Sequence, residues 1–202
     1  DSIRGTSTIT QQLARNLYLD DTRSIERKVK EAYYAIQLER QLSKEQIIEA
    51  YLNTIYLGSG ANGVQAAAQT YFSKDVEELT LAQCAVLASI PKSPKKYSPI
   101  KRLDNEDITN ADSLDFVYRG DAYSIWYQDN FKDRQNLDLQ FMKEQGFITE
   151  EEYEEAVAED IRTAIKPNIN TGAEISSYFA DYVVNQVIED LMSEYNIDEE
   201  NA

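Results

Sequence analysis

The sequence has no histidine and a single cysteine, and these two shortages exclude several kinds of active site. Histidine-based triads and zinc sites with histidine ligands cannot be built, and Cys84 has no partner for an internal disulfide. The apolar segment around Cys84, LAQCAVLASI, predicts a small buried side chain rather than a reactive thiol. Any chemistry must therefore come from carboxylates, amides and cations.

Glycine and proline are also scarce, with seven and four residues among 202. Sandwiches and barrels need many turns, whereas long runs rich in Ala, Leu, Glu, Gln and Lys favour helices. We therefore expect an all-α protein. No segment approaches the run of about 20 apolar residues that crosses a bilayer, so we expect the chain as given to be soluble.

Acidic residues outnumber basic residues by 36 to 20, which gives a net charge of −16 and argues against a nucleic-acid partner. The charge is unevenly distributed, because residues 1–53 hold eight basic and eight acidic side chains. The whole acidic excess thus lies in residues 54–202. We expect an anionic ligand to be bound by the first quarter of the chain.

Periodic apolar residues and capping signals predict a series of helices. Thr8 with Gln11, and Ser43 with Gln46, have the spacing of capping boxes. The helices are expected at 8–18, 22–42, 43–58, 61–72, 79–90, 129–145, 149–160 and 174–195. Residues 91–127 lack a helical period and are predicted to be irregular.

The helix predicted at 22–42 has two faces with different expected roles. Ile25, Val29, Ala32 and Ile36 recur at helical spacing and are predicted to face the core. Arg23, Arg27, Lys28 and Glu31 place a carboxylate within reach of cations on another face. Such residues form either exposed ion pairs, each of which stabilises the helix by about 0.3 kcal/mol, or part of a binding site.

The preceding segment favours a binding site. Ser7, Gln12 and Arg15 lie in the first turns of the helix predicted at 8–18, and the N-terminus of a helix attracts anions. Capping explains Thr8 and Gln11 but gives no reason for Gln12 and Arg15. These residues together indicate a site for a phosphate group.

Four ordered segments within residues 5–99 resemble the motifs of family 51 peptidoglycan glycosyltransferases. This family occurs in class A penicillin-binding proteins and in monofunctional transglycosylases. The segments are GTSTITQQLARNLYL, RKVKEAYYAIQLE, IIEAYLNTIYLGSGANGVQAAAQTYFSK and LTLAQCAVLASIPKSPKKYSP. Penicillin acylation is not expected from this chain.

The resemblance implies a lysozyme-like helical glycosyltransferase domain that polymerises lipid II into glycan strands and releases polyprenyl pyrophosphate. It implies that Arg15, Arg23 and Lys28 bind the donor pyrophosphate and that Glu31 is the second essential glutamate of the family. Ser7, Gln12, Arg27 and Asn53 match positions that line the substrate cleft. The resemblance also implies a divalent cation such as Mg²⁺ or Mn²⁺, inhibition by moenomycin, and work at the membrane surface on the outer, cell-wall side.

Two departures from the family pattern are visible. The general-base glutamate belongs to an E-D-x-x-F motif that the sequence does not contain, so we expect this fragment to be inactive. Thr6 replaces a glycine of the family pattern. We predict a glycosyltransferase core at 1–100, an irregular insertion at 101–128 and a helical part at 129–202 that leads toward a transpeptidase linker.

Two other interpretations remain open. The acidic residues 100–202 are suited to a docking surface or an interdomain bridge. A lysozyme-like hydrolase is the other alternative, although a cation cluster suits a pyrophosphate leaving group better than glycan cleavage.

Overall fold

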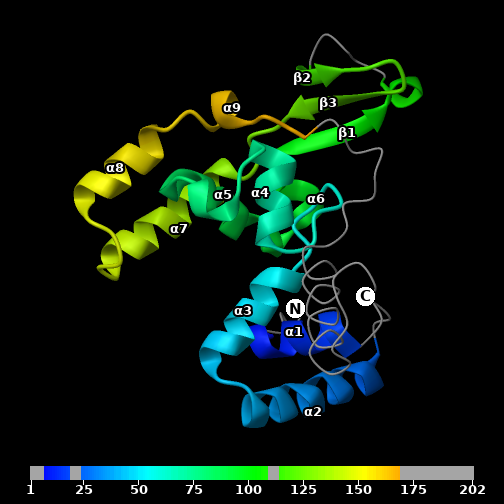
Figure 1. Cartoon of the computed structure of the whole chain (residues 1–202), viewed down its shortest axis with the longest axis vertical. Coiled ribbons are helices and arrows are strands. Elements are labelled where there is room, and N and C mark those ends of the chain that lie inside the picture. The colour runs from blue at the N-terminus through cyan, green and yellow to red at the C-terminus, as the bar shows by residue number, and fades with distance from the viewer. Residues whose placement is uncertain (1–6, 19–23, 109–113, 169–202) are drawn as a thin grey trace, which may run out of the picture. The chain divides into compact units, whose positions relative to one another are not determined.

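The computed structural model describes residues 7–18, 24–108 and 114–168 (Figure 1). Arg23, Thr6 and the helix predicted at 174–195 lie outside these ranges. The chain divides into two compact units, one extending to Ile55 and the other beginning at Tyr56. The predicted division after residue 100 rests on motif positions and stays a prediction.

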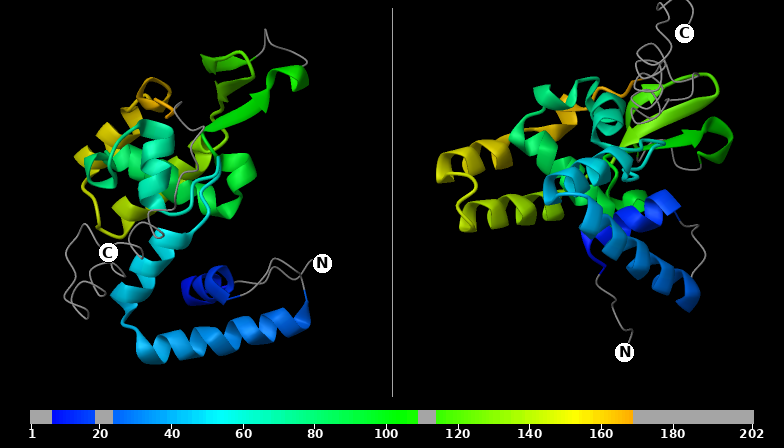
Figure 2. Two further views of the ribbon diagram at one scale, coloured as in Figure 1. Left: turned by 45° about the vertical axis from the view of Figure 1, so that its right-hand side comes forward. Right: turned by 60° about the horizontal axis from the view of Figure 1, so that its bottom comes forward.

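The first unit contains three helices, α1 (Ile9–Tyr18), α2 (Ile25–Gln41) and α3 (Lys44–Thr54). The capping box of Ser43 and Gln46 is confirmed at the start of α3. The Ser24 side chain caps α2 by accepting a hydrogen bond from the backbone N–H of Arg27 at 3.0 Å. Helix α1 packs against both α2 and α3, as the two views in Figure 2 show.

The core of this unit lies where α1 meets its two neighbours. Its buried side chains are Leu13, Ala14, Ala35, Leu38 and Ile47. Because α1 covers the side of α2 that carries Ala35 and Leu38, the opposite side of α2 is left uncovered among the described residues.

The prediction of which face of α2 packs against the core is wrong. Ile25, Val29 and Ile36 are 86%, 65% and 54% exposed, and Ala32 is half-buried. Helix α2 carries a second stripe of Glu31, Ala35 and Leu38, and that stripe is the one buried. A helical period specifies which residues share a face, but the neighbouring helix decides which face is buried.

The second unit is also mainly helical, with α5 packed against α7, and α7 against α8. Its helical elements are α4 (Val64–Phe72), η1 (Val76–Glu78), α5 (Leu81–Ser89), η2 (Ile90–Lys92), α6 (Pro94–Tyr97), α7 (Lys132–Glu144), α8 (Glu150–Ala158) and α9 (Ile161–Ala164). The helices predicted in this region are confirmed, with ends a few residues shorter. The preceding helix, predicted at 43–58, ends at Thr54.

Residues 100–104, 115–119 and 123–127 form a sheet, so the predicted irregular structure of this segment is wrong. Strands β1 (Ile100–Asp104), β2 (Asp115–Arg119) and β3 (Tyr123–Tyr127) are antiparallel in the order β1-β3-β2. A short 3-10 turn, η3 (Asn105–Asp107), follows β1. The all-α class is confirmed for the described chain as a whole, with this small sheet added to it (Figure 1).

A buried tyrosine fixes the turn that precedes α4. The Tyr71 hydroxyl donates to the carbonyl of Leu57 at 2.6 Å and lies 3.0 Å from Ser98 Oγ. Gly58 has a φ of 83°, and a Cβ there would lie 3.0 Å from the Tyr71 hydroxyl, so both conformation and space favour glycine. Burial raises the pKa of Tyr71 to about 12.

One prediction about a single residue is tested by the structure. Cys84 is exposed, so the expectation of a small buried side chain is wrong, although partial burial still raises the pKa of its thiol. Within the described ranges, no helix combines the length and apolar character needed to cross a membrane.

Candidate active site

Three of the predicted site residues meet between the start of α1 and the middle of α2. Lys28 Nζ donates a hydrogen bond to Ser7 Oγ at 2.8 Å and forms an ion pair with Glu31 Oε1. The Ser7 hydroxyl lies 3.5 Å from the same carboxylate oxygen. We call these three residues the Lys28 cluster.

The members of the Lys28 cluster differ sharply in exposure. The side chain of Glu31 is 2% exposed, whereas that of Lys28 is 48% exposed. A buried carboxylate is costly without a cation and hydrogen bonds, and Lys28 supplies both. Two of the three ammonium N–H groups are used within the cluster, so one remains for a ligand on the solvent side.

Arg27 adds a second cation on the same helix, directly before Lys28. Its Nε atom is buried and has no hydrogen-bond partner among the described residues. An unpaired buried donor is unusual in a folded protein, and an acceptor supplied by a ligand would satisfy it. Guanidinium groups bind phosphate oxygens well, because their N–H groups lie in one plane.

Gln12 and Arg15 lie on α1 near Tyr51 of α3. The Tyr51 hydroxyl donates to Gln12 Oε1 at 3.4 Å. Burial raises the pKa of Tyr51, and the positive charge of Arg15 partly opposes that rise. Sequence reasoning missed Tyr51; the available signal was an aromatic residue two positions before Asn53 in the segment EAYLN.

A second polar contact group ties the three helices together. Thr10 Oγ1 donates to Glu39 Oε1, and Lys44 Nζ pairs with Glu39 Oε2. The hydrogen bonds from Lys44 and then from Thr10 hold the pKa of Glu39 below its usual value. Because Thr10 lies on α1, these contacts fix α1 on α2 and so help to place Ser7. Neither Glu39 nor Lys44 was predicted from the sequence as part of a site.

The predicted site residues are thus brought together only in part. Ser7, Lys28 and Glu31 touch one another, while Gln12 and Arg15 gather around Tyr51. Asn53 is half-buried on α3, and in the part of the chain that the structure describes its side chain makes no hydrogen bond. The roles assigned to these residues stay predictions.

The residues present do not fit a metal held by protein ligands alone. Over the described ranges there is no group of three or more Cys, Asp or Glu side chains able to surround an ion. Glu31, the one buried carboxylate within the described part of the chain, directs Oε1 at Lys28. Mg²⁺ and Mn²⁺ prefer several oxygen ligands, so an ion here would depend on oxygens from another source.

Comparison with known proteins bears directly on this group of residues. A family model described as Transglycosylase matches residues 1–114, more than half of the chain. The chain belongs to this transglycosylase family. The match includes all described residues of the first unit, and it confirms the family resemblance read from the four motifs.

Curated relatives share this region of sequence. Penicillin-binding protein 1A of Aquifex aeolicus is 44% identical over 185 residues, covering 92% of this chain and 22% of the relative. Penicillin-binding protein 1A of Escherichia coli is 37% identical over 192 residues, covering 95% and 19%. The chain therefore spans about a fifth of the length of these relatives.

A solved structure is also similar in sequence. The crystal structure of penicillin-binding protein 1A from Haemophilus influenzae is 23% identical, with a TM-score of 0.43. The alignment covers 100% of this chain and 22% of that structure.

Proposed function

We propose that this chain supplies the glycosyltransferase function of a cell-wall synthase, polymerising lipid II into glycan strands. The observation that carries the proposal is the Lys28 cluster, in which buried Glu31 and Ser7 hold a half-exposed ammonium group. Membership of the transglycosylase family supports it, as does the name penicillin-binding protein carried by the relatives.

The proposed reaction exchanges one bond for another. A bond forms between the acceptor 4-hydroxyl oxygen and the anomeric carbon of the donor, while the bond from that carbon to the pyrophosphate oxygen breaks. The hydroxyl proton leaves to a base, and negative charge grows on the departing polyprenyl pyrophosphate. Fixed positive charge at that oxygen stabilises the transition state.

The described residues serve the leaving-group side of this reaction. Lys28 has one ammonium donor left, and Arg27 has an unpaired Nε, so both can bind phosphate oxygens. Glu31 acts on the substrate through Lys28, because its carboxylate fixes where the ammonium group lies. Arg15 adds further positive charge on α1. As the family resemblance implies, Arg23 would bind the donor pyrophosphate, and Gln12 and Asn53 would line the substrate cleft.

The proposed partners follow from the chemistry of the substrate. Lipid II and a growing glycan strand bind at this site, and the polyprenyl tail places the reaction at a membrane surface. The corresponding location is the outer face of the cytoplasmic membrane. A divalent cation, Mg²⁺ or Mn²⁺, would be held by Glu31 together with phosphate oxygens of the substrate, and no step is assigned to it.

The test is the binding of moenomycin, a phosphoglycolipid that occupies the donor site in the family. Affinity is measured by fluorescence anisotropy with a labelled inhibitor. Lys28→Ala should weaken binding by about 1–3 kcal/mol, because a charge-assisted hydrogen bond to a phosphate oxygen is lost. The matched control is Lys30→Ala on the same helix, where Lys30 pairs with exposed Glu26 at 2.7 Å.

The two variants separate a specific contact from general electrostatics. Lys28→Ala and Lys30→Ala change the net charge equally. If Lys28 contacts a phosphate oxygen, only Lys28→Ala should lose affinity for moenomycin. Equal affinities for both variants would contradict the proposal. Release of sugars from finished peptidoglycan by the chain would instead favour the hydrolase alternative.

A further inference from the structure

The second unit contains a cavity of about 540 Å³ between its sheet and α4, which the proposed function does not use. Its floor is formed by β1 and β3, where Arg102 pairs with Ile125 and Asp104 with Tyr123 across the two strands. These strands belong to the segment predicted as an insertion relative to the family pattern.

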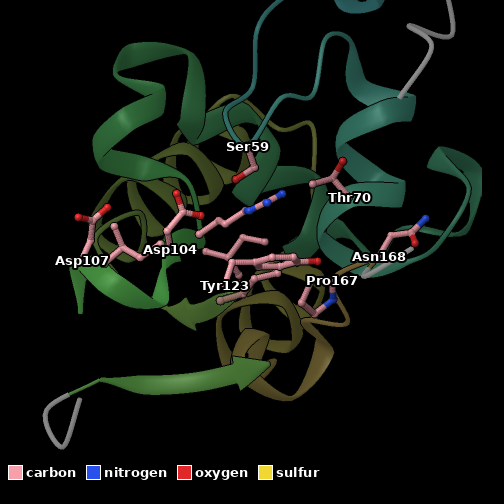
Figure 3. A pocket seen from close by; sticks show the side chains of 11 residues that line it. Ser59, Thr70, Asp104, Asp107, Tyr123, Pro167 and Asn168 are labelled. Carbon is pink, nitrogen blue, oxygen red and sulfur yellow. The ribbon is translucent and has the colours of Figure 1, made fainter. Parts of the chain in front are cut away.

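Polar groups are arranged along the cavity in a definite order. Asp104 and Asp107 lie at one end, and the Tyr123 ring lies across the middle with its hydroxyl directed toward Pro167 and Asn168 (Figure 3). Below these groups the wall is apolar, because Ile100 and Ile125 are buried and line the same cavity.

Arg102 is the cation of this cavity. Its guanidinium carbon lies 3.7 Å from the centre of the Tyr123 ring, a stacked arrangement that fixes the plane of the group. Arg102 makes no ion pair or side-chain hydrogen bond with any residue in the described ranges, although Asp104 and Asp107 line the same cavity. Its in-plane N–H groups therefore remain available to an anion.

Two other arginines of this unit have protein acceptors. Arg162 binds Asp115 through two nitrogens, at 2.6 and 2.7 Å, and Arg134 donates to the carbonyl of Ser89 at 3.3 Å. Arg102 and Arg119 each lie over an aromatic ring and have no such acceptor among the described residues. Of these two, Arg102 lines the cavity, so an acceptor for it there would come from a ligand.

We propose that this cavity binds a short zwitterionic peptide. The ligand carboxylate would bind the edge of Arg102, its ammonium group would lie toward Asp104 and Asp107, and small apolar side chains would face Ile100 and Ile125. The proposal uses residues of the second unit alone, so it stands or falls independently of the glycosyltransferase site.

The charges and the stacking favour this ligand over two others. Inorganic phosphate carries more negative charge than a carboxylate and would be repelled by the two aspartates. A neutral sugar usually stacks on an aromatic face, but Arg102 occupies a face of Tyr123. A zwitterion satisfies the cation and the carboxylates together.

The experiment is an NMR titration of the full ¹⁵N-labelled chain with tri-alanine, whose charged ends lie up to about 10 Å apart. Tri-alanine amide, which lacks the carboxylate, and N-acetyl-tri-alanine, which lacks the ammonium group, are titrated in parallel. We expect tri-alanine to shift amide signals of β1 and β3 and to bind at least fivefold more tightly than either derivative.

Two variants with one matched control locate the contact. Arg102→Gln should weaken tri-alanine binding about tenfold and leave the affinity for tri-alanine amide unchanged. Asp104→Asn should weaken tri-alanine binding while leaving the affinity for the N-acetyl derivative unchanged. Arg119→Gln removes a similar exposed guanidinium, stacked 4.0 Å from the Phe116 ring on the same sheet, and should have no effect.

Several outcomes would overturn the proposal. The first is that no amide signal shifts at a tri-alanine concentration of about 20 mM, which would mean that the dissociation constant is too weak to measure. The second is equal affinity of the chain for all three peptides. The third is an unchanged affinity for tri-alanine in Arg102→Gln. Tighter binding of inorganic phosphate or of N-acetylglucosamine than of tri-alanine would assign the cavity to another ligand class. The spectrum of each variant also reports directly whether the chain remains folded.

Discussion

Replacing Lys28 with methionine tests whether the ammonium group holds Glu31 in the buried position that defines the candidate site. Methionine keeps much of the length of the lysine stem and removes the charge. Among the described residues, Glu31 would then retain the Ser7 hydroxyl as its hydrogen-bond donor, at 3.5 Å. A buried ionised carboxylate without a cation is unfavourable, so the variant should be less stable.

The expected size of this loss follows from the exposure of the two partners. Removing one partner of a fully buried ion pair costs about 3–5 kcal/mol, whereas an exposed pair is worth about 0.2–1 kcal/mol. Glu31 is 2% exposed and Lys28 is 48% exposed, so the pair lies between these limits. We expect Lys28→Met to lower the free energy of unfolding by about 2 kcal/mol at neutral pH.

A double-mutant cycle separates the pair from other effects. Glu31→Gln removes the buried charge, so Lys28→Met in that background should cost much less. The coupling free energy should be about 1–2 kcal/mol, measured by urea unfolding with circular dichroism. Lys30→Met is the control, because Lys30 and Glu26 are 55% and 76% exposed and should couple weakly.

Two results would refute this reasoning. The first is a coupling free energy below about 0.5 kcal/mol, which is within the range of ordinary surface pairs. The second is a loss of stability in Lys28→Met no larger than that in Lys30→Met. Either result would mean that Glu31 does not depend on Lys28, and the electrostatic basis of the proposed function would fail with it.

Three further predictions concern the second unit. The Thr70 hydroxyl is buried without a hydrogen-bond partner among the described residues. Thr70→Val should therefore leave the free energy of unfolding unchanged or raise it by up to about 1 kcal/mol. A lower free energy of unfolding, measured in urea, would contradict this prediction. Tyr71→Phe leaves the Leu57 carbonyl without its donor and should cost about 1–3 kcal/mol, so an unchanged Tm would be inconsistent. Arg162 holds the pKa of Asp115 below its usual value, so this stabilisation is present above about pH 4 and lost as the pH falls through the lowered pKa. In Arg162→Gln the free energy of unfolding should therefore fall less steeply as the pH is lowered below about 4. The same pH dependence in the variant and in the unchanged chain would argue against this role of Arg162.

Local signals in the sequence were sufficient for most helices. Ser43 with Gln46, and Thr149 before Glu152, cap helices where predicted, because a capping box involves residues three apart and needs no distant partner. The family motifs likewise lie in short continuous segments. The meeting of Lys28 with Glu31 could be predicted for the same reason, since residues three apart share a helix face.

The sheet was missed although a signal was present. Aromatic and β-branched residues flank Gly120-Asp121, a dipeptide typical of a hairpin turn, and the strands on either side pair as β2 and β3. The absence of a helical period was interpreted as irregular structure instead. The pairing of β1 with β3 joins more distant residues, and a short period-2 pattern alone does not specify such a partner.

The sequence by itself determined the helical class, the family, and the set of charged residues near the first two helices. Only the tertiary structure decided which side of α2 is buried, because both stripes of the helix recur at helical spacing and α1 can cover only one of them. That choice leaves Ile25 and Val29 exposed and buries Glu31. The same packing brings Ser7, 21 residues away in sequence, to Lys28 and completes the cluster.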